Sequence, residues 1–188
     1  MRSVFLAGRT TYLRALELDD LEHFWRWFAD REIVRYSLGG WLFPTSRWET
    51  QQWLEQTLAD KRALSLGIVE QATDRLIGYG GITSISQINR SGEYFLLIGD
   101  KQCWGKGYGT EVTRLIVHYG FVTLNLHRIM LTVSSPNVGA VKAYTRAGFE
   151  VEGCMRDACY RDGAYHDKLI MAILRPNWAD DAIVDASH

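Results

Sequence analysis

Apolar and polar residues follow helix and strand periods in the first third of the chain. Residues 9–18 alternate in character, which predicts a strand. A helix is expected to begin at Asp19 or Asp20, because aspartate favours the N-cap position. The predicted buried face of this helix consists of Leu21, Phe24, Trp25 and Phe28.

A second helix is predicted further on by a reciprocal capping pattern. Gly39-Gly40 first indicates a break in the chain. Ser46 and Glu49 lie three residues apart, the spacing of a capping box, so the helix begins there and runs to about Lys61. Its predicted buried residues are Trp53, Leu54 and Leu58.

Three apolar runs joined by polar turns follow, and they predict strands over residues 63–70, 76–84 and 93–98. Short connections favour an antiparallel meander. The remaining elements are a helix over 105–123, a strand over 128–134, a helix over 137–147, and strands over 149–157 and 164–174. The chain after Pro176 is polar and is expected to fray.

The two later helices carry the clearest local signals. The helix over 105–123 is amphipathic. Its expected buried stripe consists of Val112, Leu115, Ile116 and Tyr119. Its expected exposed stripe consists of Glu111, Arg114 and His118. The next helix has Asn137 at its N-cap and Gly148 just past its end. This order of elements predicts an α/β (α+β) fold, a mixed sheet with helices on its faces.

Composition narrows the classes of protein that the chain can belong to. The 188 residues suit one domain over 1–188, with a core at about 9–174 and a tail at 175–188. No apolar run reaches the roughly 18 residues of a membrane span. The 21 basic and 22 acidic residues argue against nucleic acid as a partner. We therefore expect neither a membrane nor a nucleic-acid partner.

The three cysteines, Cys103, Cys154 and Cys159, form no C-x-x-C pair. This pattern favours neither a disulfide framework nor a zinc site. No HExxH pattern is present either, so no metal is expected. Since no export signal is evident, we expect a cytoplasmic protein.

Five of the seven tryptophans fall in the first third of the chain, at Trp25, Trp27, Trp41, Trp48 and Trp53. Large aromatic side chains dominate protein cores, so core packing is the simplest interpretation. The alternative is a substrate pocket walled by indole rings.

The segment from Gln102 to Thr110 holds three glycines between a predicted strand and a predicted helix. Glycine lets successive backbone N–H groups approach a ligand, and the helix N-terminus adds positive potential. Together these features predict a pyrophosphate site, to which Lys106 could add a charge. A glycine-rich turn without a ligand is the alternative. The dinucleotide fingerprint fails because Thr110 occupies its third glycine position, and no P-loop pattern is present.

Several segments resemble one known family. Gln102-x-x-Gly105-x-Gly107 is similar to the phosphate-binding motif of the GNAT acyl-CoA-dependent N-acetyltransferases. The segment from Asn137 through Tyr144 to Phe149 is similar to that family's N-x₆-Y-x₃-G-F pattern. The opening residues 12–20 and the closing residues 156–167 resemble its Rim-type branch, the ribosomal-protein acetyltransferases. The resemblance covers about residues 9–174.

The resemblance implies a mixed, mostly antiparallel central sheet of about seven strands, splayed between the fourth and fifth, with helices on both faces. It implies acetyl-CoA as co-substrate, without a metal. The pyrophosphate would lie on the amides between Trp104 and Thr110, and the pantetheine beside residues 96–98. A bulge at Gly99-Asp100 would free backbone donors, and an N–H near Ile98 would hold the thioester oxygen. The residues implied to bind the cofactor are Leu97, Ile98, Gln102, Trp104, Gly105, Lys106, Gly107, Tyr108, Gly109, Thr110 and Asn137.

Two residues are expected to carry the chemistry. An alkylammonium must lose a proton before it can attack, so the site needs a base, and Glu93 matches the family's usual glutamate. Tyr144 matches its usual general acid and could instead supply only a hydrogen bond to the leaving thiolate. The simpler alternatives are a solvated carboxylate at a strand end and a tyrosine packed in the core. Ala140 replaces a serine that Rim-type members often carry, which puts a Rim-type substrate in doubt.

The sequence therefore predicts an N-acetyltransferase that acts by direct attack in a ternary complex. The acceptor stays open between a protein N-terminus and a small molecule such as an amino acid, a polyamine or an antibiotic. A non-catalytic acyl-CoA sensor is the rival, since it would keep the glycine loop but would need neither Glu93 nor Tyr144. Whether the chain forms a homodimer also stays open.

Overall fold

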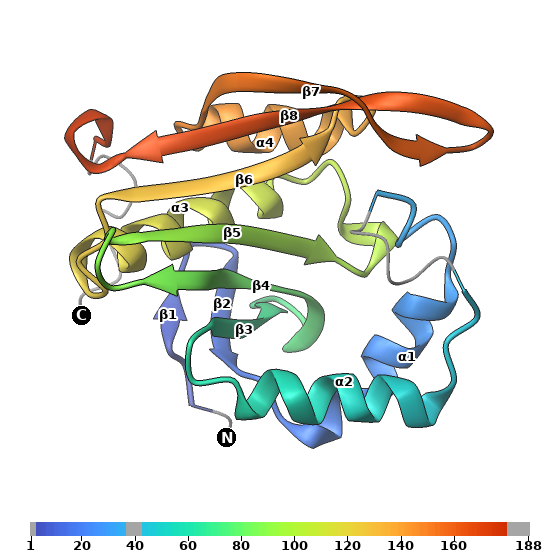
Figure 1. The fold of residues 1–188 in the computed structure, drawn as a ribbon. Helices are drawn as coiled ribbons and strands as arrows, with labels where there is room; N and C mark the ends of the chain where they lie inside the picture. Colours follow the sequence, from blue (N-terminus) through green and yellow to red (C-terminus); the bar gives the residue numbers. More distant parts are fainter. Residues whose placement is uncertain (1–2, 37–42, 180–188) are drawn as a thin grey trace.

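Eight strands form one mixed sheet with helices on both faces (Figure 1). The computed structural model describes residues 3–36 and 43–179. One strand more than expected is present because Leu6–Ala7 (β1) pairs with Thr11–Ala15 (β2). The predicted break at Gly39-Gly40, like Trp41, lies outside the described residues.

The first five strands pair in sequence order and antiparallel, and the last three of them form the meander that the short connections predict. These five strands are β1, β2, β3 (Leu64–Glu70), β4 (Arg75–Ser86) and β5 (Ser91–Ile98). The second part of the sheet is β6 (Arg128–Ser134), β7 (Glu150–Arg161) and β8 (Ala164–Leu174), with β8 in the middle. One parallel contact, between β5 and β6, joins the two parts. The strand order is therefore β1-β2-β3-β4-β5-β6-β8-β7.

Two pairs of helices enclose the sheet, each over its own apolar core (Figure 1). The helices α1 (Leu21–Ala29) and α2 (Arg47–Ala59) cover one face, around Phe24 and Leu54. The helices α3 (Tyr108–Val122) and α4 (Val138–Arg146) cover the other, around Ile116 and Tyr144. No helix in the described ranges is long and apolar enough to cross a membrane.

Several predicted faces are wrong in detail. Trp27, rather than Trp25, is buried with Leu21, Phe24 and Phe28. In α2 only Leu54 of the three expected side chains is fully enclosed, and in α3 Tyr119 is half-buried. The chain after Pro176 does not fray at once, because Trp178 packs against Phe121, with ring centroids 5.4 Å apart.

Glu111 was expected to face solvent, yet it joins α3 to the N-terminal strands. Its carboxylate accepts the backbone N–H groups of Thr10 at 2.8 Å and Thr11 at 3.1 Å, and both threonine hydroxyls. Burial raises the pKa of this carboxyl, but the four hydrogen bonds outweigh burial and leave it below its ordinary value.

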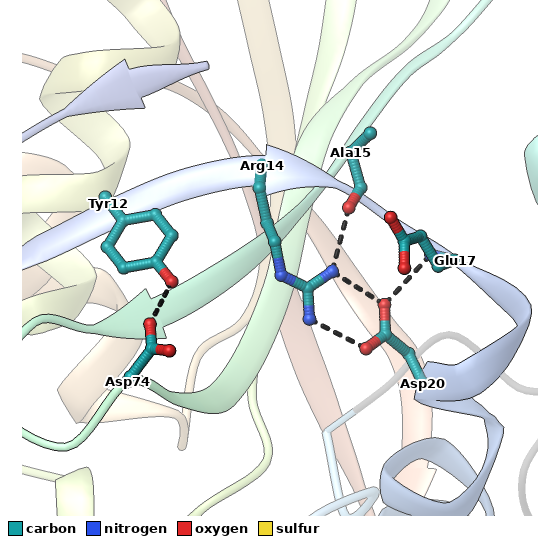
Figure 2. Close-up of polar contacts among 6 residues, drawn as sticks. All are labelled: Tyr12, Arg14, Ala15, Glu17, Asp20 and Asp74. Carbon is teal, nitrogen blue, oxygen red and sulfur yellow. Dashed lines mark hydrogen bonds and ion pairs between the residues drawn. The ribbon is translucent and has the colours of Figure 1, made fainter. Parts of the chain in front are cut away.

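A buried ion pair fixes the start of α1 (Figure 2). Arg14 on β2 donates two hydrogen bonds to Asp20, at 2.8 and 2.7 Å, and both side chains are almost fully enclosed. Asp20 lies at the N-cap of α1, as predicted, but its side chain makes no capping bond there. Its carboxylate instead accepts from Arg14 and from the N–H of Glu17.

Candidate active site

The cleft arises where the two parts of the sheet separate. Strands β5 and β6 pair in parallel over three positions, from Ser91 opposite Arg128 to Glu93 opposite Met130. Beyond Glu93, β5 continues to Ile98 with β4 on one side and no paired strand on the other among the described residues. A cleft of about 1040 Å³ occupies this gap and is lined from both faces of the sheet.

The glycine-rich loop forms one end of the cleft. Gly105 and Gly107 have φ values of +74° and +89°, which only glycine adopts without strain. Between Gly105 and Gly109, no backbone N–H donates to another described residue. The N–H groups of Trp104 and Thr110 donate to Lys101 O and Gly107 O, each at 3.1 Å. The predicted row of free amides is thus shorter at each end, because the flanking turn and the first turn of α3 use those donors.

Polar contacts hold this loop in place. The Trp104 indole donates to Ile98 O at 2.9 Å, and the Tyr108 hydroxyl donates to Glu70 at 2.7 Å. Of the residues implied for the cofactor, Gln102 and Lys106 are exposed and do not line the cleft, whereas the others do. The structure thus separates these two side chains from the rest.

The Gly99-Asp100 bulge does not supply free donors, contrary to expectation. The N–H groups of both residues donate to the same carbonyl, Ile77 O, at 2.8 and 3.1 Å. The chain does bend irregularly here, but β4 satisfies both amides. A donor for a thioester oxygen would therefore not be one of these two amides.

Glu93 and Tyr144 approach the gap from opposite faces of the sheet. Glu93 alternates with Phe95, which contacts Tyr79 on the α1/α2 face. Tyr144 lies on α4 and belongs to the core beneath α3. Both line the cleft. Glu93 has no ion-pair or hydrogen-bond partner within residues 3–36 and 43–179, so its carboxylate is available to a ligand.

Tyr144 combines a packed ring with an accessible hydroxyl. The ring meets Tyr94 edge-on, with centroids 5.8 Å apart, and burial raises the pKa of the phenol well above its ordinary value. Its hydroxyl has no hydrogen-bond partner among the described residues. Every fully buried side-chain N or O atom of the described residues does have such a partner. The hydroxyl must therefore reach open space, which here is the cleft. The alternative of a tyrosine packed in the core therefore accounts for the ring of Tyr144 but not for its hydroxyl.

Asn137 lies at the N-cap of α4, as predicted, and it accepts the N–H of Ala140 at 3.3 Å. This bond uses the side-chain oxygen, while the residue also lines the cleft. Within the described part of the chain, no group of three or more His, Cys, Asp or Glu side chains is arranged to hold a metal ion.

The α1/α2 side of the cleft was not predicted from the sequence residue by residue. It is lined by four aromatic residues, each of which contacts the next in the order Phe28, Trp53, Tyr79 and Phe95. Among the described tryptophans in the first third of the chain, only Trp53 lines the cleft, as the pocket interpretation requires. Trp27 is buried, as the core-packing interpretation requires. The placement of Phe95 could have been predicted, because it alternates with Glu93 along the strand and so shares its face.

Comparison with known proteins assigns this architecture to a class. Residues 11–150 match a profile described as an acetyltransferase (GNAT) domain. A sheet splayed over a cofactor-sized cleft, together with this match, defines an acyl-CoA-dependent N-acetyltransferase. The chain belongs to the GNAT acetyltransferase family.

Three relatives cover most of the chain. The chain is 33% identical to the probable N-acetyltransferase YjcK of Bacillus subtilis, over 92% of this chain and 98% of YjcK. A crystal structure of spermidine N-acetyltransferase from Vibrio cholerae, in complex with CoA and spermine, superposes with a TM-score of 0.80 at 30% identity, covering 89% of this chain and 97% of that one. The putative ribosomal N-acetyltransferase YdaF of Bacillus subtilis is 28% identical over 75% of this chain and 80% of YdaF.

Proposed function

We propose that this chain transfers the acetyl group of acetyl-CoA directly to a primary amine of a small molecule, while both substrates occupy one cleft. The observation that carries the proposal is the two-sided lining of that cleft. The glycine loop contributes unpaired amides at one end, and Glu93 and Tyr144 meet the gap from opposite faces. A donor and an acceptor can thus reach the same point from different sides.

The N–H groups of residues 105–109 would hold the diphosphate of the cofactor. They are adjacent and unpaired within the described chain, and the positive end of α3 adds to their potential. The Lys106 side chain, outside the cleft, would act only as a nearby charge. Trp104, Tyr108 and Thr110 would shape the wall around the phosphates, and the role of Gln102 stays a prediction.

The pantetheine arm would bind along the free side of β5, beside Leu97 and Ile98. A strand without a neighbour offers backbone donors and acceptors to an extended ligand. The Asn137 amide group, on the opposite wall, is free to add a contact. A backbone N–H near Ile98 would stabilise the negative charge that develops on the thioester oxygen.

In the transfer step, the amine nitrogen attacks the thioester carbon, so that a C–N bond forms and the C–S bond breaks. Glu93 accepts the proton that the ammonium loses, directly or through water. Tyr144 donates a hydrogen bond to the departing sulfur, or relays to it the proton that the nitrogen still has to lose after attack, so that CoA leaves as the free thiol. Because burial raises the pKa of Tyr144, the phenol stays protonated at neutral pH and serves chiefly as a hydrogen-bond donor.

Cys103 supports direct transfer rather than an acetyl-enzyme. It is the one described cysteine that lines the cleft, and burial raises the pKa of its thiol. A protonated, enclosed thiol is a weak nucleophile.

A small-molecule acceptor has more support than a protein N-terminus. The spermidine acetyltransferase structure matches this chain more completely than the relative named for ribosomal acetylation does. Ala140, where Rim-type members often carry serine, points the same way. The protein N-terminus therefore stays a prediction with weaker support.

The test is release of free thiol from acetyl-CoA in the presence of a panel of primary amines, with a peptide N-terminus included. We expect amine-dependent release with at least one small amine and none with the peptide. Tight CoA binding without release for any acceptor would contradict the proposal and favour a sensor.

A further inference from the structure

The α1/α2 side of the cleft is built from aromatic rings supplied by four different elements. Phe28 comes from α1, Trp53 from α2, Tyr79 from β4 and Phe95 from β5. Ring centroids lie 4.9 Å apart for Phe28 and Trp53, 5.3 Å for Trp53 and Tyr79, and 5.4 Å for Tyr79 and Phe95. We call these four residues the aromatic wall.

Three rings of the aromatic wall are partly exposed and form a surface of the cleft, whereas Phe28 is 3% exposed and belongs mainly to the core behind them. Phe24, which contacts Trp53 and Tyr79 from below, is fully buried and does not line the cleft. Trp53 and Tyr79 are half-buried and do line it. The Tyr79 hydroxyl has no partner in the described ranges and, like that of Tyr144, must reach open space.

The carboxylates around this side are mostly engaged. Glu32 lines the cleft but pairs with Lys101 at 2.8 Å. Asp60 lines it as well and accepts the N–H of Arg62 at 2.9 Å, with the Arg62 guanidinium 3.7 Å away. Of the carboxylates that line the described cleft, this leaves Glu93 without a partner. One free carboxylate matches one ammonium group.

We propose that the acceptor is a primary monoamine with an aryl group, whose ring packs on the aromatic wall while its ammonium faces Glu93. Aromatic rings in offset or edge contact gain stabilisation beyond the burial of their area. A polyamine would instead bring further ammonium groups to a surface with no free carboxylate for them, and leaving them unpaired is unfavourable. The proposal deepens the proposed function, on which it rests.

The first experiment compares 2-phenylethylamine, hexylamine and spermidine at saturating acetyl-CoA. We expect kcat/KM for 2-phenylethylamine to exceed that for spermidine at least about tenfold and that for hexylamine several-fold. A preference for spermidine would overturn the proposal. Equal values for the aryl and alkyl amines would overturn its aromatic part.

The second experiment replaces one ring of the aromatic wall. Trp53→Leu should raise KM for 2-phenylethylamine about tenfold, with kcat and CoA affinity within about twofold, and Trp53→Phe should recover most of the loss. The matched control is Trp48→Leu, since Trp48 lies on the same helix but is 69% exposed and outside the cleft. Equal KM values for the two leucine variants, both folded by circular dichroism, would contradict the assignment.

Calorimetry of 2-phenylethylamine with the CoA-bound protein separates this inference from the proposed function. Binding that Trp53→Leu weakens, with no acetyl transfer, would refute the function and support the aromatic wall. Transfer to other amines, with no binding of 2-phenylethylamine, would refute the aromatic wall and support the function.

Discussion

Tyr144 shows how one residue can serve both the core and the cleft. Its ring packs against Tyr94, while its hydroxyl lacks a partner in the described chain and reaches the cleft. Tyr144→Phe keeps the ring, so kcat should fall about 100-fold while CoA affinity stays the same. The control is Tyr94→Phe, which removes a buried hydroxyl bonded to Thr113 at 2.9 Å and should lower stability rather than kcat. An unchanged kcat in Tyr144→Phe would remove this residue from the mechanism.

Gly107 tests the loop at the level of one backbone angle. An added Cβ would meet nothing within 4 Å, so the penalty comes from the φ of +89°, about 1–2 kcal/mol for a residue with a side chain. Gly107→Ala should therefore displace the amides and weaken CoA binding at least tenfold, as measured by calorimetry.

Gly163 provides the matched control for that experiment. It has a φ of +82°, equally open surroundings and a place in the β7–β8 turn, outside the cleft. Gly163→Ala should lower stability by a similar amount and leave CoA affinity unchanged. If the two variants bound CoA equally well, the loop would not be the phosphate site.

Single residues also mark the limit of prediction from sequence. The N-cap role of Asn137 was predictable, because capping depends on neighbours three residues away. The pairing of Asp20 with Arg14 and of Glu111 with Thr10 was not, because a local pattern does not say which distant donor competes for a carboxylate.

At the scale of elements, the Arg14–Asp20 pair joins β2 to the start of α1 (Figure 2). Asp20→Asn leaves a buried guanidinium without its counter-charge, which should lower the free energy of unfolding by about 3–5 kcal/mol. Glu22→Gln breaks the exposed pair with Arg26 on the same helix and should change it by less than about 1 kcal/mol. Urea unfolding measures the free energy of unfolding of both variants. Similar decreases in the two variants would mean that burial does not determine how much an ion pair contributes to stability.

The bond between α3 and the N-terminal strands should depend on pH. The pKa of Glu111 lies below its ordinary value of 4.5 in the fold, so its contribution is present above that value and is lost as pH falls through the folded pKa. Glu111→Gln should thus be less stable than the natural protein at pH 7, by about 1 kcal/mol, and the difference should disappear as pH falls through the folded pKa. A difference that stays constant with pH would show that charge is not involved.

Whole elements were predicted well where one face is buried. The capping box of α2 and the alternation of β5 followed from local rules. The wrong choice of Trp25 over Trp27 has a physical reason, since both lie near the edge of the apolar stripe and the contact with Phe24 decides between them.

At the scale of the molecule, the cleft depends on how far two strands pair, and no local pattern determines that. Strand β5 pairs with β6 at three residue positions, and beyond them the two strands are not paired. The aromatic wall likewise joins residues from Phe28 to Phe95 that only the assembled sheet brings together. The family resemblance pointed to the splay, while the residues alone gave the order of elements.

The central claim is that both substrates occupy this one cleft and that acetyl passes directly between them. The most direct test is the initial rate of thiol release, measured while acetyl-CoA and an accepted amine are both varied. Direct transfer predicts reciprocal plots that intersect and no burst of thiol without amine. Parallel plots with an amine-independent burst would indicate an acetyl-enzyme and would contradict the account.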